Sequence, residues 1–174
     1  MRSAATGHHF AGYSNRFWRL LFDSGLVPDR IGYEDDGRLP EWGYGITNLV
    51  PRATPGIDTL AAEEYVAGLR ALGRKVRRWK PSVVALVGVT LYRTIEKSRP
   101  TPFPAEKLRP TPFPVENGRA GRKLRPTPFL GLRPERFEGA TVFVLPNPSG
   151  RNANFSYEEM LAAYRALAVY LGTL

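Results

Sequence analysis

The sequence places several hydrogen-bonding side chains in one short loop, directly after an apolar run. Residues 142–145 read Val-Phe-Val-Leu, a β-prone stretch, and the loop that follows is Pro-Asn-Pro-Ser-Gly-Arg over residues 146–151. A plain turn needs only one breaker, whereas two prolines and a glycine occur here within five residues. The loop therefore exceeds what a turn requires, and residues 146–151 are candidates for a functional role.

Two adjacent histidines, His8 and His9, offer a second type of chemistry, either metal binding or acid–base catalysis. Neighbouring side chains usually point apart, and no acidic residue or cysteine lies close to them in the sequence. The chain contains no cysteine at all, which excludes disulfides, thiolate zinc sites and iron–sulfur clusters. We expect neither a metal nor a cofactor.

The segments that would position these residues alternate between helical and strand patterns. Helical spacing or capping signals predict four helices, over residues 14–25, 59–80, 89–97 and 156–171. Apolar, β-prone runs predict strands over residues 45–50, 82–88 and 141–145. We expect the run 82–88 to be buried on both faces, as in a parallel sheet covered by helices. The pattern predicts an α/β fold, a three-layer α/β/α sandwich with a short, mostly parallel central sheet.

Two of the predicted helices carry specific signals. In the helix over 59–80, residues Leu60, Leu69, Leu72, Val76 and Trp79 would lie on one side and face the core. Ser156 and Glu159 have the spacing of a capping box, which would start the last helix. In sheets of this kind ligands bind beyond the carboxyl ends of the strands, and the loops after residues 50 and 145 fall there.

A basic, proline-rich segment interrupts this alternation. Residues 98–130 contain three copies of the phrase Arg-Pro-Thr-Pro-Phe and eight of the chain's sixteen prolines. Residues 97–130 include eight basic and two acidic residues, so most of the net charge of +9 lies in this stretch. Alternating prolines favour disorder or an extended polyproline conformation. We expect one discontinuous domain over 1–97 and 131–174, with an insertion that is either passive or a tether for DNA or a partner.

No part of the sequence resembles a signal peptide or a membrane-spanning helix. The first ten residues lack an apolar core, and the longest apolar run covers only residues 83–89. We expect a monomer without contact to membranes, located in the cytoplasm of a bacterial-type cell and associated with the nucleoid.

Three motifs resemble the mismatch-specific branch of the uracil-DNA glycosylase superfamily. They are TGHHFAGYSNRFW (6–18), GITNLVPRAT (45–54) and VFVLPNPSGRNANFS (142–156), in the order and, apart from the insertion, at about the spacing of that family. The resemblance implies a DNA repair enzyme that swings uracil, or in some members thymine, out of a G:U or G:T mismatch and hydrolyses its N-glycosidic bond. It implies double-stranded DNA as partner, and no cofactor.

The resemblance also implies roles for individual residues. Phe10 would stack on the extruded pyrimidine, and the Asn48 amide would bind the edge of that base. Asn147, Pro148, Ser149, Gly150 and Arg151 would enter the duplex and fill the gap, with Arg151 where many relatives carry an apolar wedge. The alternatives are that Phe10 belongs to the core, that Asn48 shapes a turn, and that residues 146–151 are an ordinary connector.

One motif of the family does not occur in the sequence. Relatives position the attacking water with the asparagine of a Gly-x-Asn-Pro-Gly loop, which follows a first strand and should lie just before Arg2. No catalytic residue is therefore identified, and the first strand of the sheet is expected to be missing. Either the start at Met1 is too late, which we favour, or the gene has decayed. The second alternative predicts a catalytically impaired DNA-binding remnant of the same fold.

Overall fold

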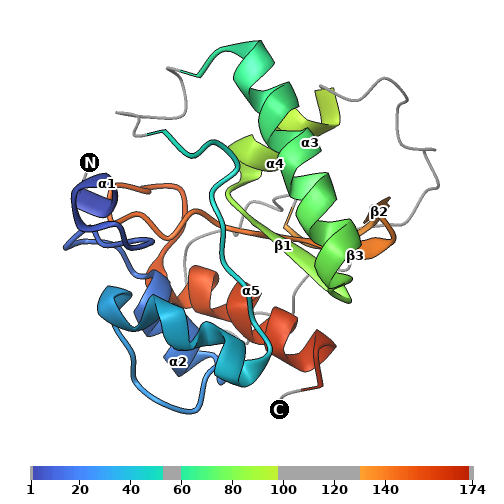
Figure 1. The fold of residues 1–174 in the computed structure, drawn as a ribbon. Coiled ribbons are helices and arrows are strands. Elements are labelled where there is room, and N and C mark those ends of the chain that lie inside the picture. Colours follow the sequence, from blue (N-terminus) through green and yellow to red (C-terminus); the bar gives the residue numbers. More distant parts are fainter. Residues whose placement is uncertain (1, 53–59, 98–129, 173–174) are drawn as a thin grey trace.

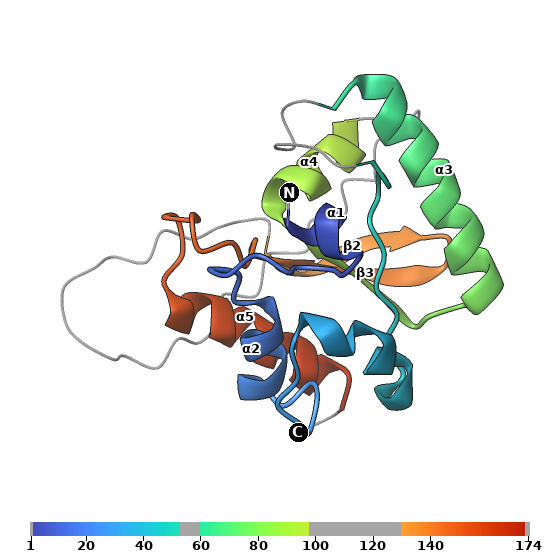
Figure 2. The same ribbon diagram turned by 60° about the vertical axis from the view of Figure 1, so that its left-hand side comes forward.

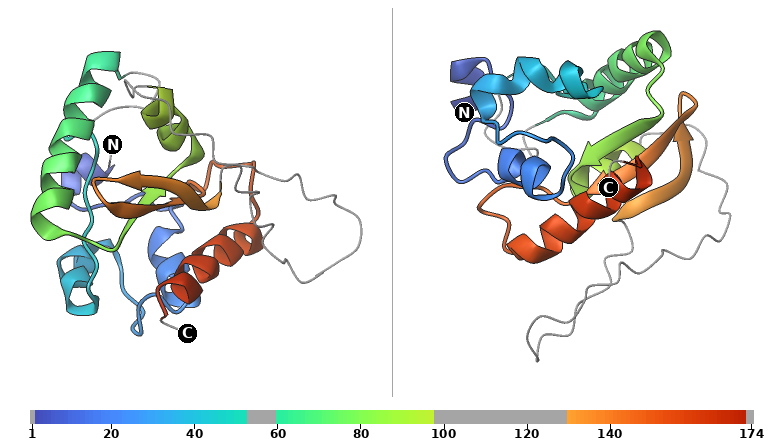
Figure 3. Two further views of the ribbon diagram at one scale, coloured as in Figure 1. Left: turned by 90° about the vertical axis from the view of Figure 1, so that its right-hand side faces the viewer. Right: turned by 90° about the horizontal axis from the view of Figure 1, so that it is seen from below.

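The computed structural model describes residues 2–52, 60–97 and 130–172, so most of the predicted insertion lies outside the described residues. The elements are, in order, α1 (Arg2–Thr6), α2 (Phe17–Asp23), the 3-10 helix η1 (Tyr33–Trp42), α3 (Ala62–Trp79), β1 (Val83–Val87), α4 (Val89–Lys97), β2 (Gly131–Phe137), β3 (Ala140–Leu145) and α5 (Tyr157–Tyr170). The small sheet lies between α3 and α4 on one side and α2 and α5 on the other (Figures 1 and 3). The predicted three-layer α/β architecture is confirmed.

The sheet has the strand order β1-β3-β2, with β3 at the centre. β1 runs parallel to β3 with Val83 opposite Thr141, and β2 runs antiparallel to β3. All six residues of β3 are buried, as expected for a central strand with helices on both faces. β2 is not among the predicted strands. It contains Pro134 and shows a register irregularity between Leu132 and Arg136, which an edge strand tolerates.

The prediction that residues 82–88 are fully buried is wrong for β1. Only Leu86 is buried in this strand, and Ala85 is exposed. β1 pairs with β3 along one edge only, and among the described residues no strand pairs with its other edge. A run of apolar residues therefore predicts a strand correctly but does not say how many neighbours will cover it.

The core on the α2 and α5 face is aromatic and well filled. Phe17, Trp18 and Leu20 of α2 pack with Met160 and Tyr164 of α5, and all five are buried. The predicted capping box is confirmed, because the Glu159 N–H donates to Ser156 Oγ at 3.2 Å and the Ser156 N–H to Glu159 Oε2 at 2.6 Å. The cap fixes where α5 starts and hence where the loop after β3 must end.

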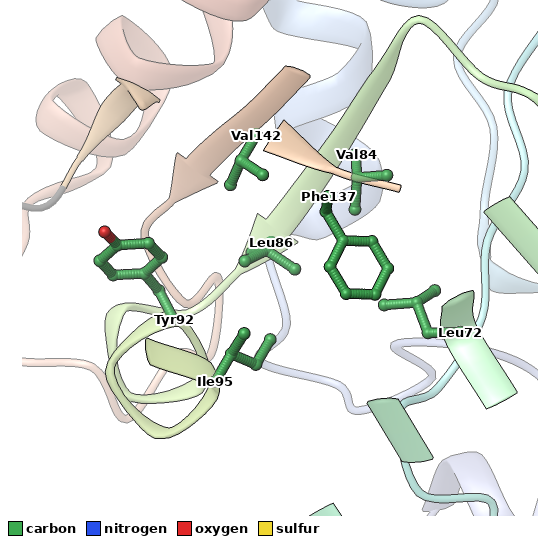
Figure 4. Close-up of a pocket in the computed structure, with 7 residues that line it drawn as sticks. All are labelled: Leu72, Val84, Leu86, Tyr92, Ile95, Phe137 and Val142. Carbon is green, nitrogen blue, oxygen red and sulfur yellow. The ribbon is translucent and has the colours of Figure 1, made fainter. Parts of the chain in front are cut away.

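The core on the α3 and α4 face contains mainly aliphatic side chains. Leu86 and Val142 of the sheet point toward Tyr92 and Ile95 of α4, as Figure 4 shows. The predicted apolar side of α3 is only partly correct. Val76 is buried, but Trp79, in the last turn of the helix, is 74% exposed.

A buried polar cluster joins α4 to β2 on the same face. The Tyr92 hydroxyl donates to Glu135 Oε1 at 2.6 Å, and Arg133 Nε lies 3.2 Å from the Tyr92 oxygen and 3.5 Å from Glu135 Oε2. Burial, together with the bond to Glu135, raises the pKa of Tyr92 well above its ordinary value. The phenol therefore remains a donor, and the cluster joins the first half of α4 to the edge strand.

The predicted strand over residues 45–50 is wrong, since these residues form an irregular segment. Instead of pairing with a strand, the segment packs on α3: a Cβ on Gly68 would lie 2.5 Å from the carbonyl oxygen of Leu49. Lys75 Nζ also lies 2.6 Å from Thr47 Oγ1. The β-branched residues at 46, 47 and 50 satisfy β propensity, but this segment packs its backbone against a helix instead of a sheet edge.

Candidate functional site

The candidate site lies where the parallel strands β1 and β3 end. The Gly88 N–H donates to the Leu145 carbonyl at 2.8 Å, which aligns the two strand ends before the chain enters α4 and the loop after β3. We call residues 146–156 the β3–α5 loop and residues 7–16 the α1–α2 segment. Figures 1 and 2 show the two side by side at this end of the sheet. The predicted loop thus lies beyond the carboxyl ends of the strands, where α/β folds bind ligands.

Internal contacts hold the β3–α5 loop in one shape. Pro146 and Pro148 are fully buried, whereas Asn147 between them is exposed. Asn147 Oδ1 accepts the Ser149 N–H at 3.0 Å, and the Asn147 carbonyl accepts the Asn152 side-chain amide at 2.8 Å. Two buried prolines alternate with residues that face outward, so the loop presents Asn147 from a rigid base.

The β3–α5 loop is also attached to the α1–α2 segment. The Arg16 N–H donates to the Pro148 carbonyl at 2.9 Å. A Cβ on Gly150 would lie 2.5 Å from both the Cβ and the carbonyl oxygen of Ser14, a separation that side chains do not reach. Glycine at position 150 is therefore required for close approach of the two segments.

Phe10 occupies the α1–α2 segment in a conformation that few side chains adopt. Its φ of 52° lies in the left-handed region. Its ring stacks on Phe17, the first residue of α2, at a centroid distance of 4.1 Å and an interplanar angle of 24°. Phe10 is half-buried, so it touches the core without being part of its interior. Contacts that hold the ring balance a backbone strain of about 1 kcal/mol or more.

Asp36 of η1 holds the segment on the other side of Phe10. Its Oδ1 lies 3.0 Å from His8 Nδ1, and its Oδ2 accepts the His9 N–H at 3.0 Å. The indole N–H of Trp18 donates to the His9 carbonyl at 3.2 Å. Burial would raise the pKa of Asp36, but the bonds from His9 and His8 outweigh it and hold the pKa below its ordinary value. The two histidines thus contribute to anchoring the segment that carries Phe10.

Asn48 is placed differently from the other predicted site residues. It is exposed on the segment that packs against α3, and its side chain makes no hydrogen bond within the part of the chain that the structure describes. The structure therefore brings the segment of Phe10 and residues 147–151 together by direct contacts, and it does not join Asn48 to them by such a contact.

A polar pocket of about 260 Å³ opens between the β3–α5 loop and the start of α4. Its lining combines predicted and unpredicted residues: Val89, Thr90, Asn147, Ser149, Arg151, Asn152, Asn154 and Phe155. Arg151 is exposed, and its backbone N–H donates to Ser149 Oγ at 3.3 Å. Asn152 and Asn154 could have been identified from the sequence, because they continue the run of small polar residues after Gly150. Thr90 could not, since it comes from the first turn of α4, more than 50 residues earlier in the sequence.

The described residues contain no group of three or more histidine, cysteine, aspartate or glutamate side chains that could hold a metal ion. None of the helices within those ranges has the length and apolar character that a bilayer crossing requires. What the arrangement offers chemically is a rigid polar loop, a half-buried aromatic ring and an arginine at the rim of a pocket.

Comparisons with known proteins agree with this arrangement. Residues 1–168 match the family described as the uracil DNA glycosylase superfamily. The chain is 34% identical over 160 residues to a G/U mismatch-specific uracil DNA glycosylase of Schizosaccharomyces pombe. The match covers 90% of this chain but only 43% of that relative, so the chain spans less than half of its length. Since the family match extends over nearly the whole sequence, this chain belongs to the uracil DNA glycosylase superfamily.

Proposed function

We propose that the protein acts in DNA repair as a glycosylase that removes uracil mispaired with guanine, by flipping the base and hydrolysing its N-glycosidic bond. The observation that carries this proposal is the attachment of the rigid β3–α5 loop to the segment of Phe10, through Arg16, Pro148, Ser14 and Gly150. A wedge that fills the gap and a ring that receives the base must act together on one nucleotide. Family membership and the mismatch-specific relative support the same reaction.

In this proposal Phe10 and Asn48 form the base pocket. One face of Phe10 is stacked on Phe17, which leaves a preformed aromatic surface for a flat pyrimidine. Asn48 is exposed and its amide carries both a donor and an acceptor, which match the alternating N–H and carbonyl groups of uracil. Within the described ranges no hydrogen bond joins Asn48 to Phe10, so in this proposal the segment of Asn48 moves toward the ring when the base enters.

The β3–α5 loop takes the place of the extruded nucleotide. Asn147, Pro148, Ser149 and Gly150 would line the gap, and the exposed guanidinium of Arg151 would reach the opposite guanine, whose O6 and N7 accept paired hydrogen bonds. Mismatched bases are easier to extrude than paired ones, which contributes to selectivity. The protein would act as a monomer on double-stranded DNA, with residues 98–130 as an insertion into a domain formed by 1–97 and 131–174.

The test is an excision assay on oligonucleotide duplexes with a G:U, G:T or G:C pair. Two proteins are compared: the 174-residue chain and a version extended by the upstream codons, to supply a Gly-x-Asn-Pro-Gly loop. We expect the extended protein to release uracil from G:U faster than from G:T and not to act on G:C. Phe10→Ala and Asn48→Ala variants should lose most of this activity, by about 10²-fold or more if both position the base.

Binding to the same duplexes, measured by fluorescence anisotropy, distinguishes an active glycosylase from a catalytically impaired DNA-binding remnant of the same fold. An extended protein that prefers G:U duplex yet leaves uracil in place would be the DNA-binding remnant. An extended protein without preference for G:U over G:C would contradict the proposed function altogether.

A further inference from the structure

Tyr13 is the most exposed large side chain of the described residues with apolar character, at 93%. It lies in the α1–α2 segment, three residues after Phe10 and directly before Ser14, the residue that touches Gly150. Single exposed apolar residues are common, so exposure alone does not indicate a partner. The way in which the backbone holds Tyr13 supplies the second observation.

A tight turn presents Tyr13. The Asn15 N–H donates to the Gly12 carbonyl at 2.9 Å, which makes Tyr13 and Ser14 the two central residues of a four-residue turn. Asn15 Oδ1 accepts the Phe17 N–H at 2.9 Å and so connects the turn to the start of α2. An aromatic ring of this exposure is thus held at a fixed place by its backbone.

The turn is packed directly against the β3–α5 loop. Ser14 approaches Gly150 so closely that no side chain fits at position 150, and the next residues bind the loop through the Arg16 N–H and the Pro148 carbonyl. A DNA duplex that receives residues 147–151 in the gap of a flipped nucleotide would therefore lie close to the turn that carries Tyr13. Aromatic rings stack on bases irrespective of sequence, and exposed rings at such a surface contribute to binding.

We propose that Tyr13 is a DNA-contacting residue, whose ring packs against the nucleotides that flank the gap and positions the duplex on the β3–α5 loop. This inference rests on the proposed function. The contact is made by the ring, so it requires the aromatic side chain but not the hydroxyl group. It would favour a distorted, partly unstacked duplex over a regular one, because unstacked flanking bases expose more of their faces.

A second exposed aromatic residue provides a matched control. Trp79 is 74% exposed in the last turn of α3, before the start of β1 and hence at the end of the sheet opposite the β3–α5 loop. Figure 1 shows this end of α3 on the other side of the molecule from α1. A duplex bound at the loop does not require Trp79, although its exposure and size are comparable.

The experiment measures affinity of the 174-residue chain for a duplex with guanine opposite a tetrahydrofuran abasic analogue, by fluorescence anisotropy, with matched G:C duplex as reference. We expect Tyr13→Ala to weaken binding to the abasic duplex about tenfold or more, Tyr13→Phe to bind like the wild type, and Trp79→Ala to leave the affinity unchanged. Thermal unfolding midpoints of all three variants are measured beside the affinities, so that a loss of binding can be distinguished from a loss of stability.

The outcomes separate the inference from the function on which it rests. A wild-type protein that prefers the abasic duplex, with unchanged affinity in Tyr13→Ala or an equal loss in Tyr13→Phe and Tyr13→Ala, would overturn the role of the ring. An equal loss in Trp79→Ala would also overturn it, since the effect would then not be specific to the turn. A wild-type protein with no preference for the abasic duplex would contradict lesion recognition itself, and the inference with it.

Discussion

The two segments proposed to handle the flipped nucleotide differ in how firmly the protein holds them. The β3–α5 loop has buried prolines at 146 and 148, an Asn147 that accepts hydrogen bonds from Ser149 and Asn152, and a direct attachment to the α1–α2 segment. The segment of Asn48 is irregular and exposed at Asn48, and it packs against α3 through Leu49 and Thr47. In the proposed function the rigid part would displace a base, which requires stiffness. The more loosely held part would close on that base, which requires freedom to move.

Replacing Gly150 should push the β3–α5 loop away from the α1–α2 segment, and we expect it to have the largest effect on stability and DNA binding. In Gly150→Ala the new Cβ would lie 2.5 Å from Ser14, whose backbone cannot yield without moving the turn. We expect a loss of about 1–3 kcal/mol in the free energy of unfolding, measured with urea, and at least tenfold weaker binding to abasic duplex.

Gly45→Ala is the matched control on the loosely held segment. No atom lies within 4 Å of a Cβ at position 45, and we expect a change below about 0.5 kcal/mol. Equal effects at positions 150 and 45 would refute the difference between the two segments.

A pair of glycines on α3 tests how the Asn48 segment is supported. Alanine in a helix is favoured over glycine by about 1 kcal/mol. In Gly68→Ala a steric clash opposes this gain, because the new Cβ would lie 2.5 Å from the backbone carbonyl oxygen of Leu49. In Gly73→Ala the new Cβ would lie 2.9 Å from Glu138 Oε1, the end of a side chain that can rotate away.

We therefore expect Gly68→Ala to lower the free energy of unfolding by about 1–2 kcal/mol, and Gly73→Ala to change it little or raise it slightly. Urea unfolding of both variants measures the difference. Stabilisation by Gly68→Ala would mean that the Asn48 segment does not rest on α3 in solution.

Low pH should weaken the contacts of Asp36 that hold the α1–α2 segment, with a smaller effect on stability than the glycine substitutions. The pKa of Asp36 is lower in the folded protein than its ordinary value, so its contribution to stability is present above about pH 4 and is lost as the pH falls further. An Asp36→Asn variant should be less stable than the wild type at pH 7, and the difference should shrink below pH 4. Thermal unfolding across this pH range measures it; a constant difference would show that the Asp36 carboxylate does not titrate with the fold.

What the sequence predicted correctly depends on signals within a few residues. The prolines and glycine at 146–150 and the capping box at 156–159 mark the β3–α5 loop, and the structure has the loop and the cap there. The exposure of Ala85 and the lack of a strand at 45–50 depend instead on which neighbours are available for pairing. Local propensity does not contain that information.

The site shows the same division. A sequence motif identifies Phe10 as a candidate, but it does not identify the contacts that hold the segment of Phe10 in place. Asp36, which binds the His9 N–H, lies 27 residues away from His9, and nothing in the sequence connects the two. Nothing in the sequence singles out Tyr13. Its position relative to the loop follows only from its exposure and from the contact between Ser14 and Gly150. Long-range contacts of this kind can be read from a fold and not from spacing.

The buried cluster of Tyr92, Glu135 and Arg133 has a consequence for how this gene can vary. The cluster joins α4, which ends at Lys97, to β2, which starts at Gly131, and these two elements flank residues 98–129 in the sequence. On the proposal that residues 98–130 form an insertion, extra copies of the Arg-Pro-Thr-Pro-Phe phrase could be gained or lost between these two elements, since doubling such a stretch costs only about 0.6 kcal/mol in closure entropy. We then expect related sequences to differ in the copy number of this phrase, while the β3–α5 loop and the turn of Tyr13 keep their lengths.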